Sequence, residues 1–174
     1  EIGAGNVNFT DVNGVLFNAE KTVLHTYPAG KTGDNYTMPD SVNSIGDDAF
    51  YGSQRLTSIT IPDGVTSIGN NAFSAIHRLK SITIPDGVTS IGQTAFMDCT
   101  RLTSITIGDS VTSIGDHAFD GCRSLTAVTF LGDAPKEGPD VFKGATPTIY
   151  RKPDAKGWGD TFGGRPVKLI GEKP

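Results

Sequence analysis

The sequence predicts a β-rich α/β fold, a right-handed solenoid of 23-residue coils with a parallel sheet on one face and short helical turns on the other. Residues 56–78 and 79–101 carry the same residue at 16 of 23 positions, and residues 102–124 match the preceding unit at 14 of 23. Self-similarity at a period of this length indicates a chain built from stacked repeats. We count five units over residues 33–147, with degenerate first and last copies.

Length, charge and hydropathy limit the number of domains and the kinds of partner that the chain can have. The chain has 174 residues, which suits a single domain over residues 1–174. Its formal net charge is −4 and its Lys and Arg residues form no stripe, so the sequence predicts no binding of nucleic acid. No apolar run is longer than three residues, which predicts no direct membrane span. No signal peptide is visible in the chain.

Each unit is predicted to begin with a strand and a turn. In the second unit Leu56, Ile59 and Ile61 form the pattern L-x-x-I-x-I, and the last two alternate as the buried side of a strand requires. The tripeptide Pro-Asp-Gly at 62–64 follows this strand and returns at 85–87. Because Pro and Gly favour turn conformations, each of these tripeptides predicts a change of direction in the coil.

A second extended segment and a helical turn complete the predicted coil. Val65 and Ile68 begin the second segment, and Gly69 ends it. The pair Ala72-Phe73 lies about four residues before the next apolar position, a spacing that suits one short helical turn. One coil leaves two open apolar faces, so neighbouring coils must cover it. The predicted core ladder consists of Ile45, Ile68, Ile91, Ile114, Phe50, Phe73, Phe96, Phe119 and Phe142.

The flanking segments are predicted to close the two ends of the array. Asn13-Gly14 lies between two apolar-alternating segments and predicts a hairpin with a type I′ turn, so we assign residues 1–35 to an N-terminal hairpin cap. Residues 148–150 predict the last strand of the ladder. The Gly- and aromatic-rich stretch 157–164 predicts an irregular cap over the final coil, so we assign residues 148–174 to a C-terminal cap.

The unit L-x-x-I-x-I-P-x-x-V-x-x-I-G-x-x-A-F-x-x-C-x-x resembles the leucine-rich repeats of the BspA-like (Treponema pallidum-type) family. The flanking stretches 14–18, 27–32 and 157–166 also resemble segments of that family. The resemblance implies a leucine-rich-repeat solenoid in a secreted or cell-surface bacterial protein that adheres to host matrix proteins, glycans or other cells. The sequence departs from the pattern where Gly108 and Leu131 replace Pro and Ile76 replaces Cys, and we expect the departures to affect the shape of the last coil.

No motif in the sequence predicts catalysis, a cofactor or a metal. Gly30-Lys31-Thr32 matches the end of a phosphate-binding loop, but the Gly required five residues before Gly30 is replaced by His25. The three histidines, His25, His77 and His117, occupy unrelated repeat positions and are predicted to be surface residues. Most aspartates occupy turn positions, where Asp is favoured for local hydrogen bonds rather than for calcium.

Cys99 and Cys122 occupy the same repeat position in adjacent coils. The spacing of neighbouring coils permits a disulfide on distance alone. Because Ile76 fills the same position one coil earlier, the position is predicted to point inward and the cysteines to be free, buried thiols.

The predicted strands present a candidate binding face. Alternation places the third and fifth residues of each unit outward, which forms one column of Ser and one of Thr. Arg residues line one margin of this face, and Asp40, Asp63, Asp86 and Asp109 line the other. The candidate residues are Ser58, Thr60, Ser81, Thr83, Ser104, Thr106, Thr129, Arg55, Arg78 and Arg101.

Three roles remain open for this face. The first is a non-catalytic, adhesin-like interaction module, a monomer that contacts proteins or glycans of host or neighbouring cells weakly and multivalently. The second is a glycan-binding module, which requires exposed aromatic residues, for which Tyr27, Tyr36, Tyr150 and Trp158 are the candidates. The third is a structural spacer without a ligand.

Overall fold

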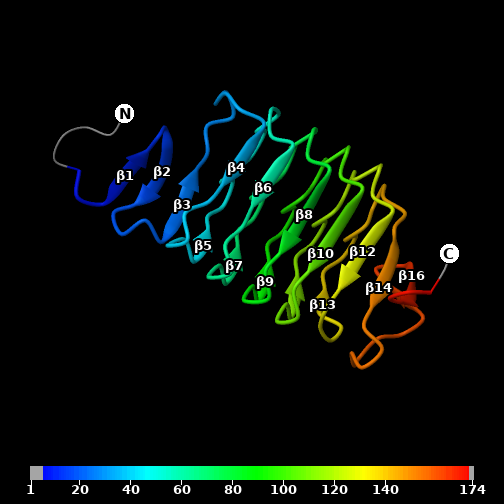
Figure 1. Cartoon of the computed structure of the whole chain (residues 1–174). Coiled ribbons are helices and arrows are strands. Elements are labelled where there is room, and N and C mark those ends of the chain that lie inside the picture. Colours follow the sequence, from blue (N-terminus) through cyan, green and yellow to red (C-terminus); the bar gives the residue numbers. More distant parts are fainter. Residues whose placement is uncertain (1–5, 173–174) are drawn as a thin grey trace.

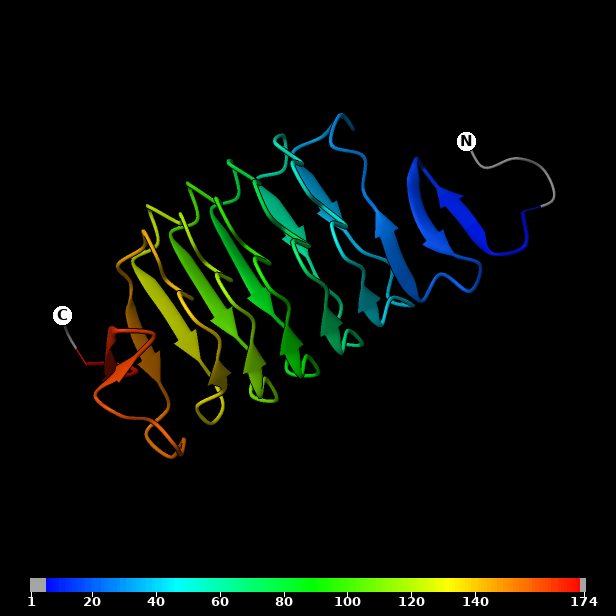
Figure 2. The same ribbon diagram turned by 180° about the vertical axis from the view of Figure 1, so that it is seen from behind.

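The chain folds as a β-solenoid whose coils follow one another along one axis (Figure 1). The computed structural model describes residues 6–172. Residues 1–5 of the predicted N-terminal cap and residues 173–174 of the predicted C-terminal cap lie outside the described residues. The N-terminal strands β1 and β2 (Phe9–Val12 and Val15–Asn18) lie at one end of the array, and β15 and β16 (Thr161–Phe162 and Arg165–Leu169) belong to the other (Figures 1 and 2).

Two rows of strands run along the array. One row is an eight-stranded sheet in the order β1-β2-β3-β5-β7-β9-β11-β13. The other row consists of a six-stranded sheet, in the order β15-β16-β14-β12-β10-β8, and a separate two-stranded sheet, β4-β6. The remaining strands of the first row are β3 (Val23–Thr26), β5 (Ser44–Ile45), β7 (Ser67–Ile68), β9 (Ser90–Ile91), β11 (Ser113–Ile114) and β13 (Lys136–Glu137). Those of the second row are β4 (Asn35–Thr37), β6 (Ser58–Thr60), β8 (Ser81–Ile84), β10 (Ser104–Ile107), β12 (Ala127–Phe130) and β14 (Thr148–Arg151).

The 23-residue period sets the register of the repeat strands. Ser104 pairs with Ser81, and Ser113 pairs with Ser90, each exactly one unit away in sequence and both in parallel strands. Even the last unit, where Lys136 and Glu137 replace the Ser-Ile pair of the second strand, keeps this register, since Lys136 pairs with Ser113. The repeat therefore holds its backbone ladder where its side chains have diverged.

Five phenylalanine rings form the centre of the core. Phe50, Phe73, Phe96, Phe119 and Phe142 are at most 1% exposed. Their ring centroids lie 5.2, 5.1, 5.3 and 5.4 Å apart in order along the array, with interplanar angles of 16°, 13°, 6° and 15°. The column is continuous because each coil places its ring directly beside the ring of the next, and Leu, Ile and Val of both rows of strands pack around it.

The predicted helical turns are wrong. Within residues 6–172 the structure contains no helix, and therefore none able to cross a membrane. The segment around Phe50 is a turn between two residues in the left-handed region, Asp48 (φ 56°) and Gly52 (φ 66°). Alternate N–H groups of the turn bond to the next coil, as the 2.7 Å bond from Phe50 N–H to the Ala72 carbonyl illustrates, and Tyr51 N–H between them bonds to the Asp48 carbonyl, three residues back, at 3.0 Å. An α-helix needs an unbroken run of right-handed residues and bonds from each N–H to the carbonyl four residues back, whereas this turn is bounded by left-handed residues and half of its N–H groups bond to another coil.

The N-terminal segment extends the eight-stranded sheet. β1 and β2 form an antiparallel hairpin around Asn13 (φ 51°) and Gly14 (φ 81°), both in the left-handed region that a type I′ turn requires. β2 pairs antiparallel with β3, and β3 joins the solenoid through parallel pairing with β5. The hairpin therefore covers the first coil on the side of this sheet.

The C-terminal segment extends the other row instead. β16 pairs parallel with β14, and the short strand β15 pairs antiparallel with β16, so the segment predicted to be irregular adds two strands. Trp158 packs on Phe130 at a centroid distance of 4.9 Å and on Phe162 at 5.2 Å. Its indole N–H donates to the Gly132 carbonyl at 3.2 Å, which fixes the ring against the last complete coil.

Candidate functional site

The outward side chains of β6, β8, β10 and β12 form a face rich in hydroxyl groups, which we call the hydroxyl face. Ser58, Thr60, Ser81, Thr83 and Ser104 are exposed, and Thr106 and Thr129 are half-buried. The intervening Ile and Val residues point inward and are buried. Alternation along each short strand therefore gives the face hydroxyl donors and acceptors above an apolar core.

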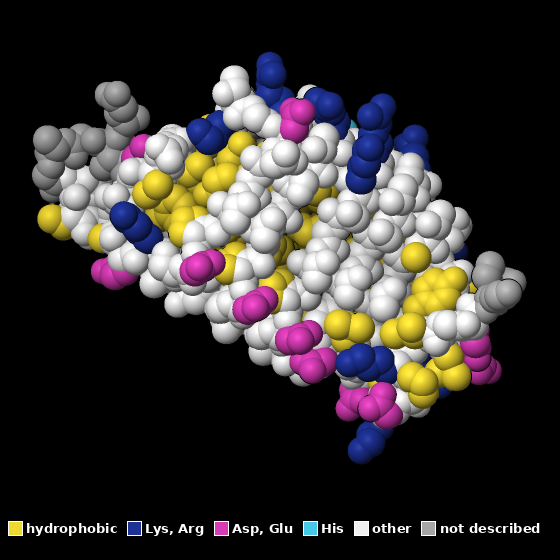
Figure 3. All heavy atoms as spheres, in the orientation of Figure 1, with side chains coloured by type: hydrophobic (Ala, Val, Ile, Leu, Met, Phe, Trp, Pro, Cys, Tyr) yellow, Lys and Arg dark blue, Asp and Glu magenta, His cyan; other side chains and the backbone are white. Residues whose placement is uncertain are grey.

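Rows of opposite charge border the hydroxyl face. Arg55, Arg78 and Arg101 precede the strands and are exposed, and Asp40, Asp63, Asp86 and Asp109 follow them and are exposed. Figure 3 shows acidic side chains along one margin and basic side chains along the other, with uncharged atoms and some hydrophobic side chains between them. The Asp86 carboxylate also accepts the Asp109 N–H at 3.2 Å, so part of the acidic row stabilises the turns between coils.

The hydroxyl face is divided between β6 and β8. Within the described residues no backbone hydrogen bond joins 57–62 to 80–85, and the two strands belong to separate sheets. In the next coils the equivalent bonds are present: Gly108 N–H donates to the Ile84 carbonyl at 3.0 Å, and Leu131 N–H to Ile107 at 2.9 Å. Pro85 has no N–H and cannot make this bond. On the other side of the coil, the β7–β9 pairing stays intact.

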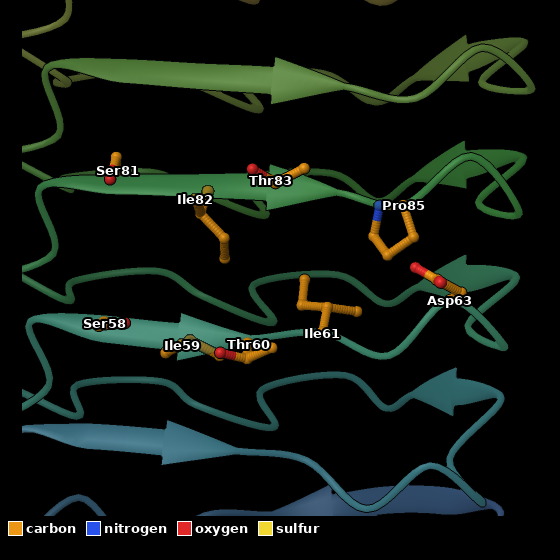
Figure 4. Close-up of a pocket in the computed structure, with 9 residues that line it drawn as sticks. All are labelled: Ser58, Ile59, Thr60, Ile61, Asp63, Ser81, Ile82, Thr83 and Pro85. Carbon is orange, nitrogen blue, oxygen red and sulfur yellow. The ribbon is translucent and has the colours of Figure 1, made fainter.

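A shallow groove of about 290 Å³ follows this break. In Figure 4, Ile82 is directed towards β6 and Ile61 towards Pro85, while Ser and Thr of both strands border the opening. Asp63 lies at the end of the groove beside Pro85 (Figure 4). The lining residues are Ser58, Ile59, Thr60, Ile61, Asp63, Ser81, Ile82, Thr83 and Pro85. The groove combines an apolar floor with hydroxyl groups and one carboxylate, a set that binds by hydrogen bonds and contact rather than by bond-making chemistry.

Other candidate residues lie apart from this groove. His25 packs against Phe9, His77 donates from Nδ1 to the Asp98 carbonyl at 3.0 Å, and His117 Nδ1 lies 3.1 Å from an Asp120 carboxylate oxygen. All three histidines are half-buried rather than fully exposed. Residues 6–172 contain no group of three or more His, Cys, Asp or Glu side chains arranged to hold a metal ion.

The two cysteines are free and buried. Each thiol donates to a phenylalanine carbonyl, Cys99 to Phe73 and Cys122 to Phe96, both at 3.1 Å. Burial raises the pKa of the Cys99 thiol to about 12 and also raises that of Cys122. Because a thiol with a raised pKa is a poor nucleophile, we interpret these buried cysteines as core residues rather than reactive groups.

The aromatic residues of the caps are mostly packed inside. Tyr27 is buried against Phe50 at a centroid distance of 5.3 Å, and Tyr36 lies 4.8 Å from Tyr27. Burial, and then the neighbouring Tyr27, raise the pKa of Tyr36 to about 12. Trp158 is half-buried as described above. These residues form no open aromatic platform.

Sequence reasoning identified the hydroxyl face but not the groove within it. The columns of Ser and Thr were taken as continuous, whereas the structure separates the residues of β6 from those of β8. The signal in the sequence is the change at one repeat position from Pro62 and Pro85 to Gly108 and Leu131. Those departures act on the ladder between coils, not only on the last coil, because each restores a backbone N–H.

Comparison with known proteins shows that the repeats match one protein family. The family model described as "BspA type Leucine rich repeat region" matches residues 30–147 in six copies. A search of curated proteins found no match.

Three solved structures are similar to the chain. A leucine-rich repeat protein from Eubacterium ventriosum is 33% identical, with a TM-score of 0.79 over 86% of this chain and 41% of that one. A leucine rich cell surface protein from Faecalibacterium prausnitzii is 26% identical, with a TM-score of 0.76 over 83% of this chain and 39% of that one. The leucine-rich repeat protein of T. pallidum is 26% identical, with a TM-score of 0.68 over 86% of this chain and 71% of that one. The chain thus spans less than half the length of the first of these.

Proposed function

Because the chain belongs to the BspA-type leucine-rich repeat family, we propose that it is a non-catalytic interaction module of a bacterial cell-surface or secreted protein. In this proposal it is a monomer that binds host or matrix proteins, and the hydroxyl face is the binding surface. The observation that carries the proposal is the position of this polar face between an Arg row and an Asp row, with a groove across it. The similar cell-surface protein from Faecalibacterium prausnitzii supports the location.

The dimensions of the face predict weak binding by a single copy. The four strands of the face lie about 4.8 Å apart and are three or four residues long, which gives at most about 13 Å per strand and roughly 250 Å² in all, about a third of the ~800 Å² that one partner buries in a standard interface. The outward positions of these strands carry no large aromatic anchor of the kind that dominates tight interfaces, since Phe130 of β12 is buried. Useful adhesion therefore depends on several copies or a longer array acting together, since linked weak sites gain avidity.

Surface plasmon resonance against a panel of matrix proteins, at low and high salt, tests the proposal. A binder should lose affinity with salt, because exposed charges are screened. Thr83→Arg, which fills the groove, should abolish that binding. Its matched control, Thr89→Arg, changes an exposed threonine that precedes β9 in the other row and should leave binding intact. Equal loss in both variants, or no saturable ligand at any salt, contradicts the proposal, and the second outcome indicates a spacer.

A glycan is the second candidate ligand, and the groove is the observation that favours it. The apolar Ile61 and Pro85 border Ser and Thr hydroxyls, and sugars offer both apolar and hydroxyl surfaces. The packed aromatic rings of the caps do not support glycan binding there. A glycan array separates the two candidates, since binding of a neutral sugar in the groove should be insensitive to salt but still lost in Thr83→Arg.

A further inference from the structure

The turns of the solenoid are joined by hydrogen bonds that all run in one direction. In each turn three backbone N–H groups donate to three carbonyls of the following coil, at 2.7 to 3.0 Å. The middle column passes through the phenylalanines, and its bonds are Phe50 to Ala72, Phe73 to Ala95, Phe96 to Ala118 and Phe119 to Val141. The flanking columns begin at Asp48 and Gly52 and follow the same pattern.

Each column is an unbroken chain of hydrogen-bonded peptide groups. Ala72 and Phe73 share one peptide group, whose carbonyl accepts from the preceding coil and whose N–H donates to the following one. Peptide dipoles aligned head to tail in this way sum as they do along an α-helix, with the positive end where the last N–H groups emerge. Bonds in such chains also polarise one another. The strands contribute little to this polarity, because sheets have small net dipoles.

The positive end of all three columns lies in the last coil. By the repeat, the N–H groups of Asp140, Phe142 and Gly144 are the next donors, and no acceptor for any of them is found among residues 6–172. Phe142 is 1% exposed. Asp140 and Gly144 are exposed, so solvent reaches their part of the turn, whereas Phe142 is buried. Because buried backbone N–H groups are nearly always paired, the Phe142 donor, with an exposed donor on each side of it, points to an acceptor that the described residues do not supply.

These donors border a cavity of about 510 Å³ that also contains a guanidinium group. The cavity lies between the last turn and the segment Gly163 to Arg165 of the C-terminal cap. Arg165 donates from Nη2 to the Phe142 carbonyl at 3.0 Å, which holds its guanidinium over the turn. Its Nε is buried and has no hydrogen-bond partner in the described part of the chain. Lys143 also borders the cavity.

We infer that this cavity is a binding site for a small oxyanion, a carboxylate or a phosphoryl group, held by the three N–H groups and Arg165. Two acidic residues border the site and limit its affinity. Asp140 is partly neutralised, since Lys143 Nζ lies 3.9 Å from its carboxylate. Glu137 forms no ion pair within residues 6–172 and therefore opposes the anion directly. The site is separate from the hydroxyl face and does not depend on the proposed function.

Titration of the ¹⁵N-labelled chain with sodium phosphate or sodium acetate, at constant pH and ionic strength, tests the inference. The amide signals of Asp140, Phe142 and Gly144 should shift saturably. Saturation with phosphate alone identifies a phosphoryl ligand, and saturation with acetate identifies a carboxylate. Arg165→Gln should weaken binding at least fivefold, and Glu137→Gln should tighten it several-fold.

Lys136→Gln is the matched control, because Lys136 is exposed on β13 beside the cavity without lining it. It should change the affinity less than twofold. The same spectra report whether each variant is folded, so a lost signal is not mistaken for lost binding. The inference is overturned if the three amides do not saturate with either anion, if sodium chloride shifts them equally, or if folded Arg165→Gln binds as the parent chain does.

Discussion

Replacing the central ring of the phenylalanine column should measure how strongly the coils depend on one another. Phe96 is fully buried, and its centroid lies 5.1 Å from Phe73 and 5.3 Å from Phe119. Phe96→Ala removes a ring that stacks on one ring in each of the two adjacent coils. Replacing a buried Phe with Ala lowers the free energy of unfolding by about 3–5 kcal/mol. Each stacked pair contributes about 0.5–1.5 kcal/mol beyond burial, so we expect a cost near the upper end of that range.

Urea unfolding followed by circular dichroism and by Trp158 fluorescence measures this cost. The indole lies in the C-terminal cap, so coincident transitions show that the coils unfold together. Tyr51→Ala is the control, because Tyr51 follows Phe50 in the first turn but is 57% exposed, and its loss should cost about 0.5 kcal/mol or less. If Phe96→Ala does not fold, Phe96→Leu should fold with a smaller loss. A loss below about 1 kcal/mol for Phe96→Ala would refute the shared column.

Three further predictions concern packing, ionisation and binding. In Gly92→Ala the new Cβ would lie 2.5 Å from the Gly69 carbonyl group, so urea unfolding should show a loss of about 1–3 kcal/mol or more, whereas Gly30→Ala, with open space around it, should not. The raised pKa values of Cys99 and Cys122 mean that the unfolded state releases its thiol protons first, so the free energy of unfolding should fall as the pH rises from about 9 towards 12. Replacing both cysteines with Ala should flatten that decline, and a thiol reagent should react with the parent chain only after unfolding. Arg78→Glu should leave Tm within about 2 °C of the parent value, because the side chain is exposed, while weakening any salt-sensitive ligand in plasmon resonance.

The sequence predicts the register of this fold because the residues that repeat every 23 positions are the buried ones. Once Ile68 and Ile91 must occupy equivalent positions, parallel pairing of β7 with β9 is the arrangement that keeps both buried. The same reasoning extends to β11 and β13, even though Lys136 and Glu137 break the apolar pattern. The backbone ladder continues there because it needs only the spacing of the coils.

The turn containing Phe73 was predicted as helical because apolar spacing does not report hydrogen-bond partners. Ala72, Phe73 and Ile76 are buried in the structure, as a helical turn would also place them. What excludes the helix is the left-handed backbone at Asn71 and Ala75, together with an acceptor supplied by the next coil. Asn adopts that conformation readily, but Ala does not, so local sequence gave no sign of the second reversal. The conformation of this turn depends on the carbonyls of the next coil, which the local sequence does not reveal.

One repeat position differs between the two sides of the break in the hydroxyl face. That position holds Pro62 and Pro85 in the coils of β6 and β8, which are not paired with each other, and Gly108 and Leu131 in the coils where the ladder is closed. A Cβ on Gly108 would lie 2.4 Å from the Pro85 carbonyl oxygen, so the close approach of β10 to β8 there requires glycine. Pro85 brings both a bulky ring and a missing N–H to the equivalent place, and the strands before it stay apart. The residues that depart from the repeat therefore supply the bonds that close the sheet from β8 onwards, and the proline at 85 cannot supply the corresponding bond to β6. Proline alone does not part the strands, since β4 and β6 stay paired beside Pro62.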